Sequence, residues 1–289
     1  MKFTDRVYEI VRDIIALMWG GYSFAIKIKL FFAYVKILFK FFVINNVFKK
    51  IYREKILGYT IYFPEYELFF NLFREIFIMK TYYFKTEEKQ PLIIDCGSSI
   101  GISILFFKWL YPSAKIIGFE PLPTSYEYLQ RNVIVNRLSN VFVYNFAVYN
   151  YEGLVEFYSD EELYSLSSRI VFSDFKNLEY KKVQVKCCRL SDYITENVEL
   201  LKLDIEGSEL KVLEEIKEKL YLIRRIILEF HPFEGQTIKQ NKENSLIRLL
   251  NILENANYHY RIGSSIRHEL LWNVSTSYNL FIFAYKDSN

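Results

Sequence analysis

Residues 91–101 constrain the fold of this chain more than any other stretch, because they read as a strand, a tight turn and the start of a helix. The segment is Pro-Leu-Ile-Ile-Asp-Cys-Gly-Ser-Ser-Ile-Gly. Its apolar run, 92–94, suits a strand buried on both faces, and Gly97 and Gly101 permit close backbone approach where a helix begins. Such a turn accommodates a nucleotide-like ligand or serves the fold alone, since Asp-x-Gly-x-x-x-Gly recurs by chance.

Composition indicates one large α/β domain with an appendage. A chain of 289 residues, 51% of them hydrophobic, buries a sizeable core. Its aromatic share of 18% is spread along the chain, which favours packing over a dedicated stacking site. Three cysteines, two of them adjacent at Cys187 and Cys188, give neither a disulfide framework nor a zinc-binding spacing. Acids also interrupt the first twenty residues, where a secretory signal is apolar, so we expect a cytoplasmic protein.

The N-terminal segment is both basic and apolar. Residues 1–58 carry a net charge of +7, which leaves −4 for the remainder of the chain. Residues 22–53 contain neither proline nor acid and predict a long helix on which Lys29, Lys36 and Lys40 share one sector. These lysines make a membrane-spanning helix costly, so we hypothesise that the segment lies on an anionic membrane surface, at the inner face of the membrane. The alternative is a helix packed on its own domain or on a partner subunit.

The sequence divides near residue 57. Residues 1–56 form the helical segment, and residues 57–289 form the main domain, which begins with a short lead-in subdomain, 57–90. Within that subdomain, residues 57–63 predict a strand and residues 67–80 predict a helix.

From residue 91 onward strand-like and helix-like segments alternate, which is typical of a sheet with parallel strands. The predicted strands are 92–95, 115–119, 140–146, 199–204, 224–230 and 279–285. The predicted helices lie near 100–110, 123–137, 207–220 and 242–256. Two further predicted strands, 153–158 and 181–189, flank a polar loop that we expect to wall a substrate pocket. That loop contains Ser165, Ser167, Ser168 and Arg169.

An acid closes the second predicted strand. Glu120 follows Ile-Ile-Gly-Phe and lies 25 residues after Asp95. Ligands of open α/β sheets bind outside the carboxyl ends of the strands, where such an acid accepts hydrogen bonds from both ribose hydroxyls. A nicotinamide dinucleotide prefers Gly-x-Gly-x-x-Gly around its pyrophosphate. S-adenosylmethionine has no phosphate, and Asp95 suits its cationic groups, so we expect S-adenosylmethionine rather than NAD.

Charged residues close two later strands. Lys202 and Asp204 lie at the end of one strand, and Glu229 and His231 lie two apart at the end of the next. We expect Asp204 beside the ligand crevice and His231 as a general base, since an ordinary histidine pKa of about 6.5 suits that role. The alternative for His231 is a structural histidine. The same side chains suit a divalent metal, which we favour less because no recognised ligand spacing is present. Two further acids open the following helix, where the helix dipole favours them on structural grounds as well: Glu206 and Glu209.

These segments together resemble the FkbM family of S-adenosylmethionine-dependent methyltransferases across residues 58–285. The motifs are Asp95-Cys-Gly-Ser-Ser-Ile-Gly101, Phe119-Glu-Pro121 followed by Asn132 and Asn136, Asn145-Phe-Ala-Val148 with Gly153, Lys202-Leu-Asp-Ile-Glu-Gly-Ser-Glu209, and Glu229-Phe-His231. The resemblance implies an α/β fold with a Rossmann-like class I methyltransferase sheet, mostly parallel with an antiparallel last strand. It also implies methyl transfer to a hydroxyl oxygen, often on a sugar, glycan or glycolipid.

The resemblance implies a set of cofactor-binding positions as well. They are Asp95, Gly97, Gly101 and Glu120, with Ala147 as a neighbour of the adenine. Arg74-Glu-Ile-Phe77 and Tyr83 are similar to the segment that precedes the glycine turn in part of the family, and Ser99 stands where the family has Asn. We include Tyr83 and Ser99 in the expected cofactor site.

The expected mechanism is an in-line displacement in which alignment of the acceptor oxygen supplies most of the acceleration. We expect His231 or Asp204 as the base, Glu229 orienting the imidazole, and Lys202 binding an anionic or hydroxylated group of the substrate. One alternative is a nucleic-acid methyltransferase, although the strand end reads Asp-Ile-Glu-Gly rather than Asp-Pro-Pro-aromatic. The other is a membrane-associated interaction protein whose methyltransferase fold no longer catalyses.

Overall fold

The chain folds into two compact units. The structure is a computed structural model that describes residues 3–19, 21–44, 52–159, 181–231, 245–264 and 280–287. The first unit comprises Met1–Glu87, Ile100–Pro112 and Glu127–Leu138, and the second comprises Glu88–Ser99, Ser113–Tyr126 and Ser139–Asn289. Residues 57–87, which are predicted from sequence to open the main domain, lie in the same unit as the N-terminal segment.

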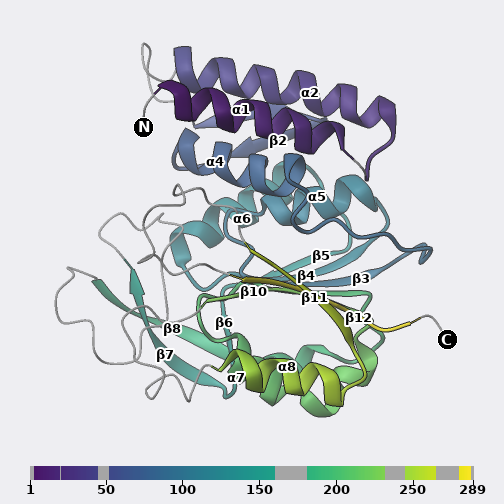
Figure 1. The fold of residues 1–289 in the computed structure, drawn as a ribbon. Helices are drawn as coiled ribbons and strands as arrows, with labels where there is room; N and C mark the ends of the chain where they lie inside the picture. Colours follow the sequence, from purple (N-terminus) through teal and green to yellow (C-terminus); the bar gives the residue numbers. More distant parts are fainter. Residues whose placement is uncertain are drawn as a thin grey trace. The chain divides into compact units, whose positions relative to one another are not determined.

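The first unit is mainly helical. Its elements are α1 (Phe3–Met18), α2 (Phe24–Phe39), the π-helix η1 (Lys40–Ile44), strands β1 (Arg53–Ile56) and β2 (Tyr59–Tyr62), α4 (Tyr66–Phe73), the π-helix η2 (Arg74–Ile78), α5 (Ile102–Leu110) and most of α6 (Pro123–Val135). Helices α1 and α2 lie side by side (Figure 1), and both pack on η2. Helix α2 buries one face because its apolar residues recur at helical spacing, at Leu30, Ala33, Tyr34 and Ile37.

Two predictions for this unit need correction. The long helix predicted over 22–53 is confirmed from Phe24 to Ile44, but Arg53 belongs to β1, and residues 45–51 lie outside the described part of the chain. The strand predicted over 57–63 is the second arm of a hairpin, β1–β2, in which Ile56 pairs with Tyr59. Leu57 and Gly58 turn the chain there with φ of 51° and 90°, the left-handed pair that a tight hairpin turn requires.

The second unit is built on a seven-stranded sheet in the order β11-β12-β10-β9-β3-β4-β5. Its strands are β3 (Leu92–Cys96), β4 (Lys115–Phe119), β5 (Val141–Tyr144), β9 (Leu200–Leu203), β10 (Arg225–Phe230), β11 (His259–Ser264) and β12 (Leu280–Tyr285). All neighbours are parallel except β12, which runs antiparallel to both β10 and β11. The predicted α/β sheet, mostly parallel with an antiparallel last strand, is therefore confirmed.

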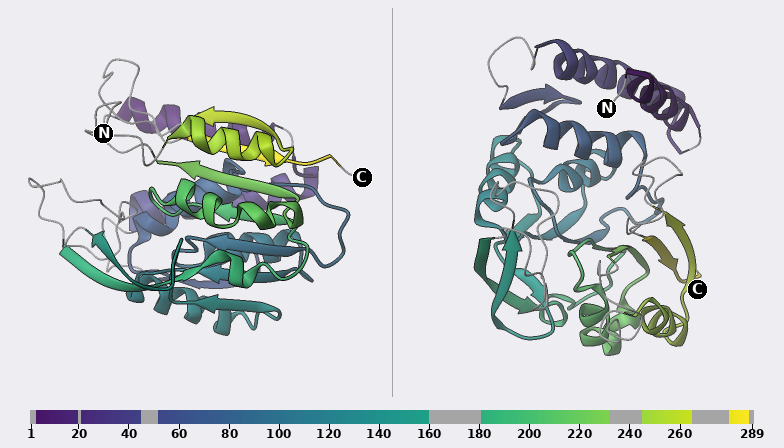
Figure 2. Two further views of the ribbon diagram at one scale, coloured as in Figure 1. Left: turned by 90° about the horizontal axis from the view of Figure 1, so that it is seen from below. Right: turned by 60° about the vertical axis from the view of Figure 1, so that its left-hand side comes forward.

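The central strands of this sheet are buried. Every residue of β3 and β9 is buried, as expected for central strands covered on both faces. Helices α7 (Glu209–Glu215) and α8 (Leu246–Asn255) lie side by side on one face of the sheet (Figure 1), and Figure 2 shows the same sheet from two further sides. The 3₁₀ helices η3 (Leu190–Tyr193) and η4 (Lys217–Leu222) flank this core.

A small second sheet in the order β6-β8-β7 completes this unit. Its strands are β6 (Ala147–Tyr149), β7 (Gly153–Ser159) and β8 (Lys181–Arg189), so the two strands predicted around the serine-rich loop are confirmed. The loop itself, with Ser165, Ser167, Ser168 and Arg169, lies outside the described residues, as do the beginning of the helix predicted over 242–256 and residue 279. Among the described helices, none combines the length and the apolar character that crossing a bilayer requires.

Candidate active site

The turn after β3 is fastened to the strands on both sides of it. The backbone amides of Gly97 and Ser98 both donate to the carbonyl oxygen of Phe119, at 2.9 Å each. Gly97 has φ of 84°, and a Cβ placed on it would lie 1.9 Å from the carbonyl oxygen of Asp204. This position therefore accepts glycine alone, because a side chain would collide with the backbone that follows β9.

The structure joins this turn to Glu120, as the sequence predicted for a cofactor site. The Ser99 amide donates to Oε2 of Glu120 at 2.8 Å, and the Leu122 amide donates to Oε1 at 3.0 Å. Asn145 fixes the same corner by donating from Nδ2 to the carbonyl oxygens of Glu120 and Pro121, at 2.9 Å each. Burial raises the pKa of Glu120 to about 7. Each carboxylate oxygen accepts one backbone hydrogen bond from the described residues, and a carboxylate oxygen has a second lone pair for a hydroxyl donor.

Lys202 has a different place from the one expected of a substrate-binding residue. Its Nζ lies 3.1 Å from Oδ1 of Asp95 and donates to the carbonyl oxygens of Gly97 at 2.8 Å and Cys96 at 3.3 Å. Both Asp95 and Lys202 are buried. Burial alone would lower the pKa of Lys202, but the charges of Asp95 and Asp204 raise it above its usual value. Lys202 thus fixes the turn internally, and Asp95 reaches that turn through an ion pair.

His231 lies at the centre of four carboxylates. Its Nδ1 is 2.9 Å from Oε1 of Glu209. Its Nε2 is 3.5 Å from Oε2 of Glu206, 3.7 Å from Oε1 of Glu229 and 3.9 Å from Oδ1 of Asp204. Burial alone would lower the pKa of His231, but the charges of Glu206, Glu209 and Glu229 raise it well above 6.5. The buried imidazole is consequently an electrostatic partner of all four acids, which we call the His231 cluster.

Topology explains why these residues meet. Strands β9 and β10 are parallel neighbours with Leu203 opposite Leu228, so the residues at their carboxyl ends come together at one edge of the sheet. Asp204, Glu229 and His231 are predicted from sequence to lie at this edge, and the structure brings them together. Glu206 and Glu209 have a structural explanation at the start of a helix, and their contacts with His231 are not predicted from sequence. The same strand-end rule was the available signal, since both follow β9 within six residues.

The remaining predicted cofactor positions take no part in the contacts described above. Ala147 is buried at the start of β6, opposite Cys187. Gly101 belongs to the first unit, where it is the N-cap of α5 with φ of 89°. A Cβ placed on it would lie 2.7 Å from Cδ1 of Leu129. Tyr83 also belongs to the first unit and donates its hydroxyl to the carbonyl oxygen of Gly21 at 3.0 Å. Roles of these three residues at a cofactor stay predictions.

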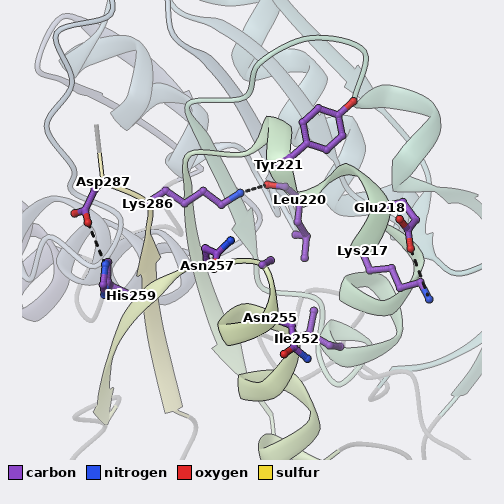
Figure 3. Close-up of a pocket in the computed structure, with 11 residues that line it drawn as sticks. Lys217, Glu218, Leu220, Tyr221, Ile252, Asn255, Asn257, His259, Lys286 and Asp287 are labelled. Atoms are coloured by element: carbon purple, nitrogen blue, oxygen red, sulfur yellow. Dashed lines mark hydrogen bonds and ion pairs between the residues drawn. The ribbon is translucent and has the colours of Figure 1, made fainter. Parts of the chain in front are cut away.

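A cavity of about 780 Å³ lies at the opposite end of the sheet, near the start of β10 and the end of β12. Figure 3 shows that several of its charged groups pair within its own wall. Lys286 donates to the carbonyl oxygen of Leu220 at 2.6 Å, and His259 lies 3.1 Å from Asp287. The cavity thus lies away from the turn after β3 and from the His231 cluster, where the chemistry-bearing residues gather.

Comparisons with known proteins relate this chain to methyltransferases. The sequence model of the methyltransferase FkbM domain matches residues 95–260. Methyltransferase sdnD from Sordaria araneosa is 30% identical over 191 residues, which cover 55% of this chain and 73% of that protein. The 2-O-methyltransferase NoeI from Sinorhizobium fredii is 27% identical over 168 residues, which cover 52% of this chain and 68% of that protein. The solved methyltransferase FkbM from Methylobacillus flagellatus aligns with a TM-score of 0.45 at 16% identity, over 75% of this chain and 53% of its own length.

Proposed function

The chain belongs to the FkbM methyltransferase family, and from that premise we propose that it transfers a methyl group from S-adenosylmethionine to a hydroxyl oxygen of a sugar, glycan or glycolipid. The observation that carries this proposal is the direct packing of the turn after β3 on Asp204, with 1.9 Å between a Cβ placed on Gly97 and the Asp204 carbonyl oxygen. It puts the predicted cofactor turn next to the His231 cluster. The name of the relative NoeI, a 2-O-methyltransferase, supports oxygen as the acceptor atom.

The residues at the turn fit the cofactor that the family implies. Glu120 is held by the amides of Ser99 and Leu122, one on each carboxylate oxygen, so its remaining lone pairs suit the two ribose hydroxyls. Gly97 keeps the turn free of a side chain. When bound there, S-adenosylmethionine supplies an electrophilic methyl group whose bonding electrons stay on the sulfur.

The two most accessible acids of the His231 cluster are the candidates for binding the acceptor hydroxyl. The side chains of Asp204 and Glu206 are 25% and 20% exposed, whereas that of His231 is 4% exposed. The acceptor hydroxyl donates its hydrogen bond to one of these carboxylates, which orients a lone pair of the oxygen for attack. As the new C–O bond forms, the hydroxyl proton passes to that carboxylate. Of the two predicted bases, Asp204 is the better placed, and His231 with Glu209 holds the surrounding acids in position.

The test uses S-adenosylmethionine with a deuterated methyl group and the full-length chain. Glycan and lipid extracts are incubated with enzyme, and mass spectrometry locates the trideuteromethyl group in the products. We expect an O-methyl group, and we expect Asp204→Asn to lower the yield at least tenfold while Asp192→Asn, at a half-exposed acid paired with Arg189, leaves it unchanged. Transfer to a ring nitrogen of added RNA, with no labelled glycan or lipid, would favour the nucleic-acid alternative and end this proposal.

The N-terminal helices support a proposal about where the enzyme works. Each exposes an apolar stripe at helical spacing on the side away from η2. The exposed residues are Val7, Val11, Ile15 and Met18 on α1, and Phe24, Ile28, Phe32, Val35 and Phe39 on α2. Trp19, next to them, is 81% exposed. Exposed apolar area of this extent on a basic segment suits the surface of an anionic membrane.

The structure reassigns two of the lysines on which the sequence hypothesis relied. Lys36 and Lys40 each lie 2.7 Å from a carboxylate oxygen of the buried Glu54, so they tie α2 and η1 to β1. The apolar stripe rather than these lysines is therefore the main contact that we propose for the membrane. A membrane-bound enzyme is also well suited to a glycolipid acceptor.

Co-sedimentation with vesicles tests this attachment. We expect the full-length chain to bind vesicles of phosphatidylglycerol and phosphatidylcholine, and Phe32→Ser, at a 67% exposed position, to weaken binding at least threefold. Phe142→Ser, at a 48% exposed position of β5, is the matched control and should bind like the unaltered chain. Equal vesicle binding by both variants, or a dimer in sedimentation that Phe32→Ser dissolves, would reject the membrane as the occupant of this surface.

A further inference from the structure

The His231 cluster has the geometry of a cation site. One ligand atom from each of Asp204, Glu206 and His231 lies within 4.8 Å of the other two. Nε2 of His231 is 3.5 Å from Oε2 of Glu206 and 3.9 Å from Oδ1 of Asp204. Ligands at about 2.1 Å from a common ion lie roughly 3 Å apart when adjacent and roughly 4.2 Å apart when opposite. The two separations from Nε2 fall between these limits and the third is within 4.8 Å, so one ion reaches all three atoms after a small adjustment of the carboxylates.

Glu209 orients the imidazole in the manner of an outer-shell carboxylate. Its Oε1 lies 2.9 Å from Nδ1 of His231 and also accepts from the amide of Gly207 at 3.1 Å. Glu209 is fully buried. A carboxylate on Nδ1 fixes the ring so that Nε2 faces a metal, and such partners are typical of metal-binding histidines. Here Nε2 faces Asp204, Glu206 and Glu229.

A second observation points to a positive charge at this place. Oε2 of Glu209 is buried and has no hydrogen-bond partner among the described residues. A buried carboxylate oxygen without a partner is costly, and nearby positive charge reduces that cost. The Nζ of Lys202 is 3.6 Å from Oδ2 of Asp204, the oxygen that does not face His231, and it also pairs with Asp95. A cation bound at Nε2 would replace the proton that the surrounding acids favour on the ring and would keep a positive charge beside the imidazole that Glu209 contacts.

We propose that Asp204, Glu206 and His231 bind one divalent first-row cation, with Glu229 as a further oxygen ligand and Glu209 as the outer-shell carboxylate. A set of one imidazole and several carboxylates suits Mn²⁺, Fe²⁺ or Zn²⁺ better than Ca²⁺, which takes oxygen ligands alone. The inference rests on the proposed function in one respect: the cation would hold the acceptor oxygen and make its hydroxyl more acidic. With three or four ligands from the protein, the ion would keep coordination positions open for the acceptor oxygen.

Binding of the metal alone tests the inference without an acceptor. The full-length chain is freed of metal with a chelator and titrated with Mn²⁺ while the paramagnetic resonance of free Mn²⁺ is recorded, and Zn²⁺ is then tested by competition. We expect one site per chain. Glu206→Gln and Asp204→Asn should each weaken it at least tenfold, and Glu209→Gln about 10- to 100-fold. Asp192→Asn should bind like the unaltered chain.

Two arms keep the outcomes separate. Thermal unfolding verifies that each variant is folded. If Asp204→Asn does not fold, Glu206→Gln is the variant that tests the cation site. Calorimetric titration with S-adenosylmethionine in the presence of chelator reports cofactor binding independently. Absence of Mn²⁺ and Zn²⁺ binding, or equal affinity in Glu206→Gln and the unaltered chain, overturns the cation site even where S-adenosylmethionine binds. Metal binding without S-adenosylmethionine binding would instead leave the site intact and overturn the proposed function.

Discussion

Gly97→Ala is the change whose effect follows most directly from the geometry. Gly97 has φ of 84°, and an added Cβ would lie 1.9 Å from the carbonyl oxygen of Asp204. A left-handed backbone costs alanine about 1–2 kcal/mol, and overpacking in a tight site adds about 1–3 kcal/mol. We therefore expect the free energy of unfolding to fall by about 2–5 kcal/mol, since backbone on both sides must shift.

Gly58→Ala separates the two contributions. Gly58 has nearly the same backbone, with φ of 90°, but its Cβ would meet nothing within 4 Å. Urea unfolding followed by circular dichroism should show a loss of only about 1–2 kcal/mol there. The difference between the two variants measures the collision with Asp204. Equal losses would refute the reasoning, because they would mean that the turn after β3 does not press on the segment after β9. Gly97→Ala should also weaken S-adenosylmethionine binding at least tenfold, whereas Gly58→Ala should not.

Three further changes test other contacts. Burial raises the pKa of Glu120 to about 7, and the ribose hydroxyls donate to its ionised form. The affinity for S-adenosylmethionine should therefore be constant above pH 7 and should fall about tenfold per pH unit well below pH 7. Calorimetry of Glu120→Gln should show weaker binding that does not depend on pH. Lys202→Met leaves Asp95 buried without its cation and should cost about 3–5 kcal/mol in urea unfolding, whereas Lys115→Met, at an exposed pair with Glu196, should cost less than about 1 kcal/mol. All three cysteines are buried, and burial raises the pKa of the Cys96 thiol. Ellman's reagent should therefore react slowly with the native chain, whereas all three thiols should react in denaturant. Rapid labelling of all three thiols in the native chain would contradict the packing of β3 and β8.

The sheet was predictable from sequence because its information is local. A buried strand such as β3 is an apolar run, and the acid or glycine that follows it marks the carboxyl edge. Pairing of Glu120 with the turn at Ser99 was predictable for the same reason, since neighbouring parallel strands end at one edge.

Side-chain direction was not predictable in this way. Successive side chains along β9 point to opposite faces of the sheet. This alternation does not predict that the ammonium group of Lys202 contacts Asp95 and the carbonyl oxygen of Gly97. Glu209 satisfies the rule for acids at helix starts, which concealed its contact with His231. The hairpin at Leu57 and Gly58 was missed because its second strand alternates like an independent one. Each of these features depends on contacts between segments distant in the chain.

Calorimetric titration of the full-length chain with S-adenosylmethionine tests the central claim most directly, that the turn after β3 and Glu120 form a cofactor site. We predict binding at one site per chain with a Kd below about 1 mM, in the range of ordinary substrate affinities, and a loss of at least tenfold in Glu120→Ala. Absence of a binding signal at millimolar S-adenosylmethionine, or an unchanged Kd in Glu120→Ala, would contradict the account.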